Sequence, residues 1–270
     1  MQLVAYGAQD VYLTGNPQIT FWKVTYRRHT NFAMESIEQT FNGQADFGRR
    51  VTCTISRNGD LAYSTYLQVT LPEIGQSLIN GSTHDRTNGV YARWLDNPGL
   101  QLIHQVEVEI GGQRIDKHYG DWLNIWNELT QEPGHQVGYD NMVGNTAALT
   151  GSGLNVTEAT TLYVPLQFWF CRNPGLALPL IALQYHEVKV NMTFRSLLSL
   201  INSDGTSNVT MRDPNISLWV DYIYLDTEER RRFSQKAHEY LIEQVQHNSM
   251  SFSSKVKMNF NHPVKEIMWV

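Results

Sequence analysis

Alternation of apolar and polar residues constrains this chain more than any other feature of its sequence. In the segment Leu102–Ile110, Val106 and Val108 fall on one face of a strand while Glu107 and Glu109 fall on the other. A period of two predicts half-buried β-strands with one wet face. Eight segments fit this pattern: Met34–Phe41, Arg50–Ile55, Tyr63–Leu71, Leu102–Ile110, Gln113–Lys117, Leu162–Phe170, Gln184–Phe194 and Ile216–Leu225. Eight is the number of strands that a jelly-roll sandwich requires, so the predicted fold class is all-β.

The connections between these segments differ greatly in length. Gly111 and Gly112 predict a two-residue turn with positive φ. Two connections, Pro72–Leu100 and Tyr119–Thr161, are long, and loops beyond about 15 residues in a compact domain are usually functional or disordered. In a jelly roll these two connections leave from the same end of the sandwich, so we expect them to gather there.

One helix is predicted inside the second long connection, at Tyr119–Thr130. Trp122, Ile125, Trp126 and Leu129 recur at the spacing of one helix face. We expect this apolar stripe to pack on the sandwich. The sequence thus predicts one or two short helices among the strands.

A segment with no catalytic spacing, Pro165–Val190, carries a family resemblance. It reads as an aromatic strand, an Asn-Pro-Gly turn, a short apolar connector and a second alternating strand. With four further blocks it resembles the major capsid proteins of nucleocytoplasmic large DNA viruses, such as phycodnaviruses, iridoviruses and mimivirus-like viruses. Those blocks are Tyr6–Gly43, Gly48–Pro72, Val108–Leu129 and Leu225–Gln246, the last followed by HPVKEIMWV.

This resemblance implies an architecture and a function. Members of the family carry two similar jelly rolls per chain, a double jelly roll. Three chains form a pseudo-hexagonal capsomer that tiles an icosahedral shell, with the long loops facing outward. The implied partners are two further copies in a homotrimer, neighbouring capsomers, and minor capsid proteins beneath the shell. The implied location is the virion, with synthesis and assembly in the host cytoplasm.

The resemblance also implies a division of the chain. We expect an extended N-terminal arm over residues 1–28, a first jelly roll over 29–226, a linker helix over 227–238 and the first strands of a truncated second jelly roll over 239–270. In the linker, Thr227–Gln235 places acids first and bases last, as the helix dipole favours. Strand-like patterns follow at Tyr240–Val245, Phe252–Phe260 and Val264–Val270. The sequence is therefore expected to be a piece of a longer protein.

Composition excludes several other classes of protein. A net charge of −5 lacks the basic excess of a genome-coating protein, so no direct nucleic-acid partner is expected. Cys53 and Cys171 are too few for a disulfide framework and are expected to be small buried apolar side chains. The longest apolar stretch, Leu176–Leu183, falls short of the roughly 20 residues that span a bilayer. The first residues, MQLVAYGAQDVYL, lack the basic region and the unbroken apolar core of a signal peptide, so none is expected there. Direct membrane insertion is not expected.

No catalytic or metal-binding motif is present, so no enzyme activity, metal or cofactor is expected. H-E-x-x-H, C-x-x-C, P-loop and G-x-S-x-G patterns are all absent. A cupin-like metal site would need an H-x-H pair, which is lacking, and His104 and His118 are expected at the surface or an interface. Two alternatives remain open: a jelly-roll module that binds carbohydrate or a receptor, and a minor or penton capsid protein with one jelly roll.

Aromatic residues on the long loops are the candidate interface anchors. They are Trp94, Trp122, Trp126 and Tyr139, which the strand pattern does not place inside; packing within one subunit is an equally weighted alternative. Two arginines near the N-terminus, Arg27 and Arg28, are expected to face a neighbouring subunit or solvent rather than to bind phosphate. Arg230–Arg232 are expected to be solvated and offset by the acids that precede them.

Two asparagines are weak candidates for glycosylation. Asn80 and Asn155 both lie in N-x-S/T sequons within the long outward loops. Asn191 also lies in a sequon, but it falls inside a predicted strand and is expected to be unmodified.

Overall fold

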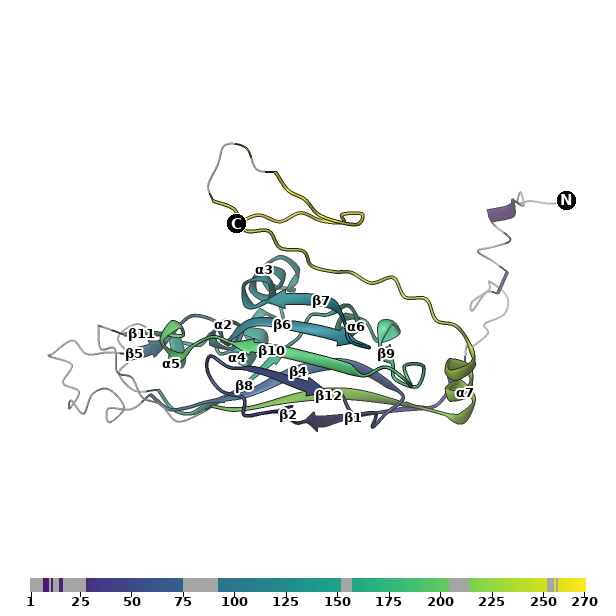
Figure 1. Ribbon diagram of the computed structural model, residues 1–270, viewed down its shortest axis with the longest axis horizontal. Coiled ribbons are helices and arrows are strands. Elements are labelled where there is room, and N and C mark those ends of the chain that lie inside the picture. The colour runs from purple at the N-terminus through teal and green to yellow at the C-terminus, as the bar shows by residue number, and fades with distance from the viewer. Residues whose placement is uncertain are drawn as a thin grey trace.

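The computed structural model describes residues 7–9, 11, 15–16, 28–74, 92–151, 157–203, 214–251, 255 and 257–270. Two antiparallel sheets enclose one apolar core (Figure 1). In spatial order the first sheet consists of β1 (Phe32–Gln39), β12 (Asn215–Leu225), β4 (Leu61–Leu71) and β8 (Thr160–Pro165), with the short β9 (Leu178–Pro179) also paired to β4. The second consists of β2 (Phe41–Asn42), β3 (Arg50–Thr54), β10 (Val188–Phe194), β6 (Ile103–Ile110) and β7 (Gln113–Tyr119).

This strand order is that of a jelly roll. The chain crosses repeatedly between the two sheets, and the last long strand, β12, returns to lie between β1 and β4. Each of the eight segments predicted from alternation overlaps one of the long strands, so the predicted fold class is confirmed.

The core lies between the inward faces of the two sheets. Leu67 and Val69 of β4, Leu218 of β12 and Val108 of β6 are each 0% exposed, whereas the intervening Gln68 is half-buried on the outer face. Burial of apolar surface contributes roughly 25 cal/mol per Å², so these inward faces hold the sandwich together.

The predicted turn at Gly111 and Gly112 is confirmed. Their φ angles are 61° and 82°, and the turn joins β6 to β7 with Ile110 opposite Gln113. Residues with a Cβ rarely adopt two successive positive φ angles, which explains the paired glycines.

Two predicted strands are shorter than expected. The segment Leu162–Phe170 leaves the sheet at Pro165, and Trp169–Arg172 form the short helix α6. Phe168, Trp169 and Phe170 are all buried in succession, which a strand with alternating faces cannot achieve. At Gln184–Phe194 the strand begins only at Val188, because turns occupy the residues before it.

The described parts of the long connections hold more helix than predicted. They contain four helices: α2 (Pro98–Leu102), the predicted α3 (Gly120–Thr130), α4 (Gln136–Val143) and α5 (Ala147–Thr150). Two short strands, β5 (Ala92–Trp94) and β11 (Ile201–Ser203), pair with each other beside them. Single turns of 3-10 helix, η3 (Pro174–Leu176) and η4 (Leu197–Ser199), complete the described elements before β12. Helices this short leave no clear period in a sequence.

The packing face of α3 was predicted wrongly. Leu123 and Asn127 are buried, whereas Leu129 is 61% exposed. Trp122 and Trp126 are half-buried at the border of the two faces. Because the prediction included Trp122 and Trp126 in the packing face, it placed that face on their side of the helix rather than around Leu123 and Asn127.

The C-terminal part confirms the predicted helix but not the predicted strands. Helix α7 covers Thr227–Gln235, and the Asp226 carboxylate caps it by accepting a hydrogen bond from the Glu229 N–H at 2.9 Å. None of the described residues after Gln235 lies in a strand, including those of Tyr240–Val245 and Val264–Val270. A strand needs a partner ladder, and the described residues of these segments pair with no other described strand. Part of the third predicted strand, Phe252–Phe260, lies outside the described residues.

Candidate assembly surfaces

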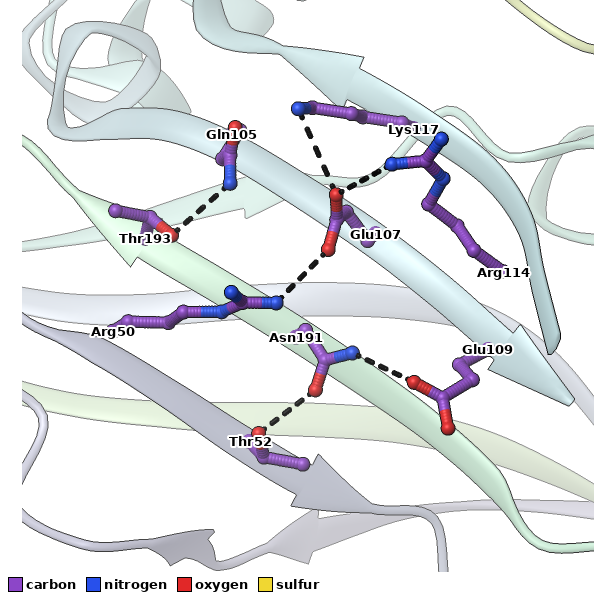
Figure 2. A network of polar contacts seen from close by, with 9 residues as sticks. All are labelled: Arg50, Thr52, Gln105, Glu107, Glu109, Arg114, Lys117, Asn191 and Thr193. Atoms are coloured by element: carbon purple, nitrogen blue, oxygen red, sulfur yellow. Dashed lines mark hydrogen bonds and ion pairs between the residues drawn. The ribbon is translucent and has the colours of Figure 1, made fainter. Parts of the chain in front are cut away.

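A network of polar side chains covers the outward face of the second sheet (Figure 2). Its centre is Glu107, whose side chain is only 9% exposed. One carboxylate oxygen lies 3.2 Å from Arg50 Nη2, and the other lies 3.4 Å from Arg114 Nη1 and 3.6 Å from Lys117 Nζ. Three cations therefore share one carboxylate, and the side chains of Arg50 and Arg114 remain 61% and 63% exposed.

Neutral side chains extend the same network across the neighbouring strands. The Asn191 amide accepts from Thr52 Oγ1 at 2.8 Å and donates to Glu109 Oε2 at 3.2 Å, and Gln105 donates to Thr193 (Figure 2). These bonds occupy the amide that a glycan would modify, so the folded chain holds Asn191 in the sheet.

The outward face of the first sheet carries aromatic and acidic side chains in place of the basic side chains of the second sheet. Trp219 lies opposite Tyr66, and Gln68 opposite Tyr163, which is 45% exposed. The five strands of this sheet contain no Lys or Arg; their charged residues are Glu35, Glu38 and Asp221. This face combines aromatic rings, hydroxyl groups and carboxylates.

Aromatic residues of α3 and α6 cover one side of the sandwich, next to β7 and β8. The Arg172 guanidinium lies 4.8 Å from the ring centroid of Trp126, and its Nη2 lies 2.9 Å from a Glu243 carboxylate oxygen. A hydrogen bond from Lys265, followed by the Arg172 charge, lowers the pKa of the Glu243 carboxyl. Trp122 packs beside Trp126 with ring centroids 5.8 Å apart.

The C-terminal segment runs along the edge of β7 (Figure 1). The Val245 N–H donates to Asp116 Oδ1 at 3.1 Å, and the Gln244 amide donates to the Ile115 carbonyl. His247 packs on Tyr119 with ring centroids 5.1 Å apart. The segment thus covers part of an edge strand that would otherwise expose unpaired backbone groups.

Beneath this segment lies a buried pair, Asp116 and His118. Asp116 Oδ2 is 2.9 Å from His118 Nε2, and both side chains are at most 2% exposed. The His118 ring stacks on Phe168 with centroids 4.4 Å apart. The expectation that His118 lies at the surface is therefore wrong, whereas His104 is exposed.

The two long connections meet at one end of the sandwich, as predicted. Ile74 and Thr157 exchange backbone hydrogen bonds of 2.9 Å, and Arg93 Nη1 donates to the Thr150 carbonyl at 2.6 Å. In Figure 1 the elements β5, β11 and α5 lie together at the left, opposite α7 and β9. Residues from distant parts of the sequence thus build one loop end.

Two of the four predicted aromatic anchors are buried inside the subunit. Trp94 is 0% exposed and stacks on Phe47, and Tyr139 is 8% exposed, where burial raises its pKa to about 12. Neither offers surface to a partner, so these two are corrected to core residues. Trp122 and Trp126 keep exposed surface and remain candidates.

The other candidate residues from the sequence are Arg27, Arg28, Asn80 and Asn155. Arg28 is exposed, which suits contact with a neighbour or with solvent. Arg27, Asn80 and Asn155 lie outside the described residues.

Within the part of the chain that the structure describes, no group of three or more His, Cys, Asp or Glu residues is placed to hold a metal ion. A hollow of about 340 Å³ is lined by residues that include Tyr63, Tyr66, Trp126 and Cys171. Burial raises the pKa of Cys171 to about 12 and that of Cys53 to about 11, so both thiols stay protonated near neutral pH.

None of the helices among the described residues has the length and apolarity needed to cross a bilayer.

The Glu107 network was missed in the sequence. The alternation of β6 placed Glu107 on a wet face, and a carboxylate there is normally a solvated group. Its partners come from β3 and β7, 57 positions before it and 7 and 10 after it, so only the sheet register reveals them.

The strand order and the gathered loops define a jelly-roll protein, and comparison with known proteins gives the family. The model for the major capsid protein N-terminus matches residues 20–226, and the model for the large eukaryotic DNA virus major capsid protein matches residues 229–270. The chain belongs to the major capsid protein family of large eukaryotic DNA viruses.

Individual relatives agree with this membership. The chain is 62% identical to the major capsid protein of Phaeocystis pouchetii virus, over all of this chain and 57% of that protein. It is 50% identical to capsid protein 1 of Acanthamoeba polyphaga mimivirus, over all of this chain and 48% of that protein. It is similar to the crystal structure of PBCV-1 VP54, with a TM-score of 0.69 and 43% identity over 83% of this chain and 50% of that one. The chain spans about half the length of these relatives.

Proposed function

We propose that this chain is the N-terminal part of a major capsid protein that self-assembles into trimeric, pseudo-hexagonal capsomers of an icosahedral shell. One observation carries the proposal: a complete jelly roll whose sequence is 62% identical, over its whole length, to a major capsid protein. A shell protein needs flat flanks for lateral contact and a distinct outer end, and the sandwich offers both.

The proposal extends to the division of the chain. Residues 1–28 would be an arm, 29–226 the first jelly roll, 227–238 the linker and 239–270 the start of a second jelly roll. The family match over residues 229–270 supports this division and disfavours a minor or penton protein with one jelly roll. The segment around Val245, docked on β7, would lead from the first jelly roll to the second.

The orientation in the shell follows from the two ends of the sandwich. The loop end would face outward, carrying any glycans at Asn80 and Asn155. The opposite end, near α7 and β9 in Figure 1, would face neighbouring capsomers and minor capsid proteins below. The exposed Arg28 would contribute there together with Arg27. Assembly would take place in the host cytoplasm, and the role is structural rather than enzymatic.

Antibody labelling of purified virions tests this proposal. Antibodies against residues 147–151, at the loop end, are expected to label intact particles. Antibodies against residues 180–187, at the opposite end, are expected to label only disrupted particles. Absence of this chain from purified particles would overturn the proposal, and the reverse labelling pattern would overturn the orientation.

A further inference from the structure

Strand β1 lies at the edge of the first sheet with its outer side open. Among the described strands it pairs with β12 alone, in a register that runs from Phe32 opposite Leu225 to Gln39 opposite Leu218. Every second residue of an antiparallel strand directs its N–H and C=O away from its partner. The outer side of β1 therefore presents a row of backbone donors and acceptors. In Figure 1 this strand lies along the lower margin of the sandwich, on the other side from the C-terminal segment.

Most of the features that protect an edge strand from pairing are missing in β1. Edge strands are commonly blunted by Lys, by Pro, by a bulge or by a covering element. Strand β1 contains no Lys or Pro, and its register on β12 has no bulge. Six of its eight residues are exposed, including Phe32 at 60% and Met34 at 50%. A long, regular edge with exposed apolar side chains is suited to accept a further strand.

Carboxylates along this edge select the kind of strand that can be added. Glu35 and Glu38 are exposed in β1, and the neighbouring Asp221 of β12 accepts a hydrogen bond from Ser36. The partner printed for the Glu35 carboxylate is a neutral group, the Tyr224 hydroxyl at 3.4 Å, and the strands of this sheet contain no Lys or Arg. Two copies of β1 joined edge to edge would place four glutamates along one seam, where like charges repel. The edge thus disfavours a second copy of itself and favours a strand with basic residues.

We infer that β1 accepts an extended segment of a different protein, which adds to the first sheet as an antiparallel strand. The segment carries basic residues opposite Glu35 and Glu38 and apolar residues opposite Phe32 and Met34. Backbone hydrogen bonds supply affinity in this mode of binding, and cross-strand pairs of opposite charge or of apolar side chains supply specificity.

Strand addition is compatible with the proposed capsomer. An added strand extends the sheet sideways at its edge, so the outward faces of both sheets stay free for neighbouring jelly rolls. The inference goes beyond the proposed self-assembly, because the partner is not a copy of this chain and the argument rests on the edge itself.

A synthetic peptide tests this binding on the full chain. Lys-Val-Thr-Lys-Val-Thr-Val, aligned antiparallel, places its lysines opposite Glu38 and Glu35 and its valines opposite Ile37, Met34 and Phe32. Fluorescence anisotropy of the labelled peptide is expected to show saturable binding at least about tenfold tighter than that of Glu-Val-Thr-Glu-Val-Thr-Val. Absence of saturable binding, or equal binding of the two peptides, would overturn the inference.

Backbone methylation distinguishes strand addition from attraction between charges. Methyl groups on alternate peptide nitrogens remove the N–H groups along one side of an added strand. Of two isomers, methylated at the odd or at the even positions, one is expected to bind within about threefold of the parent peptide and the other at least about tenfold more weakly. Hydrogen exchange in the complex is expected to slow at alternate amides of β1. Equal binding of the two isomers, or no slowing at β1, would overturn the inference.

Charge reversal on the chain supplies a matched variant. Glu35→Lys with Glu38→Lys is expected to reverse the preference, so that the glutamate peptide binds at least about tenfold tighter than the lysine peptide. Glu228→Lys with Glu239→Lys changes the net charge equally at exposed positions outside β1 and is expected to leave the preference unchanged. Circular dichroism establishes that each variant is folded, and the methylated peptides test the unmodified chain in any case. An unchanged preference in the first variant, or a reversal in the control, would overturn the inference and leave the proposed shell function standing.

Discussion

Asp60 and Arg230 join the loop after β3 to helix α7 through a two-point ion pair. Arg230 Nε lies 3.0 Å from Asp60 Oδ1, and Arg230 Nη2 lies 3.1 Å from Oδ2. Asp60 Oδ2 also accepts the backbone N–H of Leu225 at 2.8 Å, and its side chain is only 9% exposed. This pair fixes the start of the proposed linker against the end of the first jelly roll.

Loss of the Arg230 side chain should loosen this junction. Among the described residues, Arg230→Ala leaves the nearly buried Asp60 carboxylate with the Leu225 N–H as its remaining partner, which costs about 1–2 kcal/mol after allowance for the half-exposed arginine. Urea unfolding measures the loss. Arg231→Ala, at an exposed position one residue along, is the control and should change stability by less than about 0.5 kcal/mol. Equal effects of the two substitutions would contradict a specific role for Arg230.

The contact between Asp60 and Arg230 could not be predicted from the sequence alone. Alternation predicted β3, β6 and β12 because each presents one face to the core, a local property of the sequence. Arg230 was predicted to be a solvated charge offset by Glu228 and Glu229, but its partner lies 170 positions away and depends on tertiary structure. The core position of Trp94 and the Glu107 network were missed for the same reason.

In the turn between β6 and β7, alanine should destabilise the fold more at Gly111 than at Gly112. A Cβ at Gly111 would lie 2.6 Å from His186 Nδ1, whereas one at Gly112 meets nothing within 4 Å. Both substitutions carry the roughly 1 kcal/mol penalty of a positive φ. Thermal unfolding should therefore show a larger loss for Gly111→Ala, and adding His186→Ala should return it to the level of Gly112→Ala. Identical losses in the two single variants would contradict the predicted contact.

Alkaline pH should destabilise the fold. Burial raises the pKa of Cys53 to about 11, that of Cys171 to about 12 and that of Tyr139 to about 12. The unfolded chain loses these protons at lower pH, so stability is complete below about pH 8.5 and falls as pH rises toward 12. Urea unfolding midpoints measured between pH 8 and 11 test this decrease in stability with pH. A midpoint that rises over this range would contradict it, and Cys53→Ala should flatten the first part of the fall.

Hydrogen exchange should reveal the docking of the C-terminal segment. The Val245 amide donates to Asp116, and Glu243 ties the same segment to Arg172 and Lys265. Glu243→Gln removes the charge that both cations contact and should speed exchange at Val245 by several-fold, since exposed ion pairs contribute at most about 1 kcal/mol. Glu239→Gln, at an exposed position, is the control. Unprotected exchange at Val245 in the original chain would contradict the docking.

The solution mass of the chain tests the central claim of self-assembly most directly. Three copies of 31.0 kDa weigh 3 × 31.0 = 93.0 kDa. Light scattering after size exclusion is predicted to give a discrete species at that mass, stable on dilution. A species that remains at 31.0 kDa at every concentration would contradict the claim that this chain self-assembles.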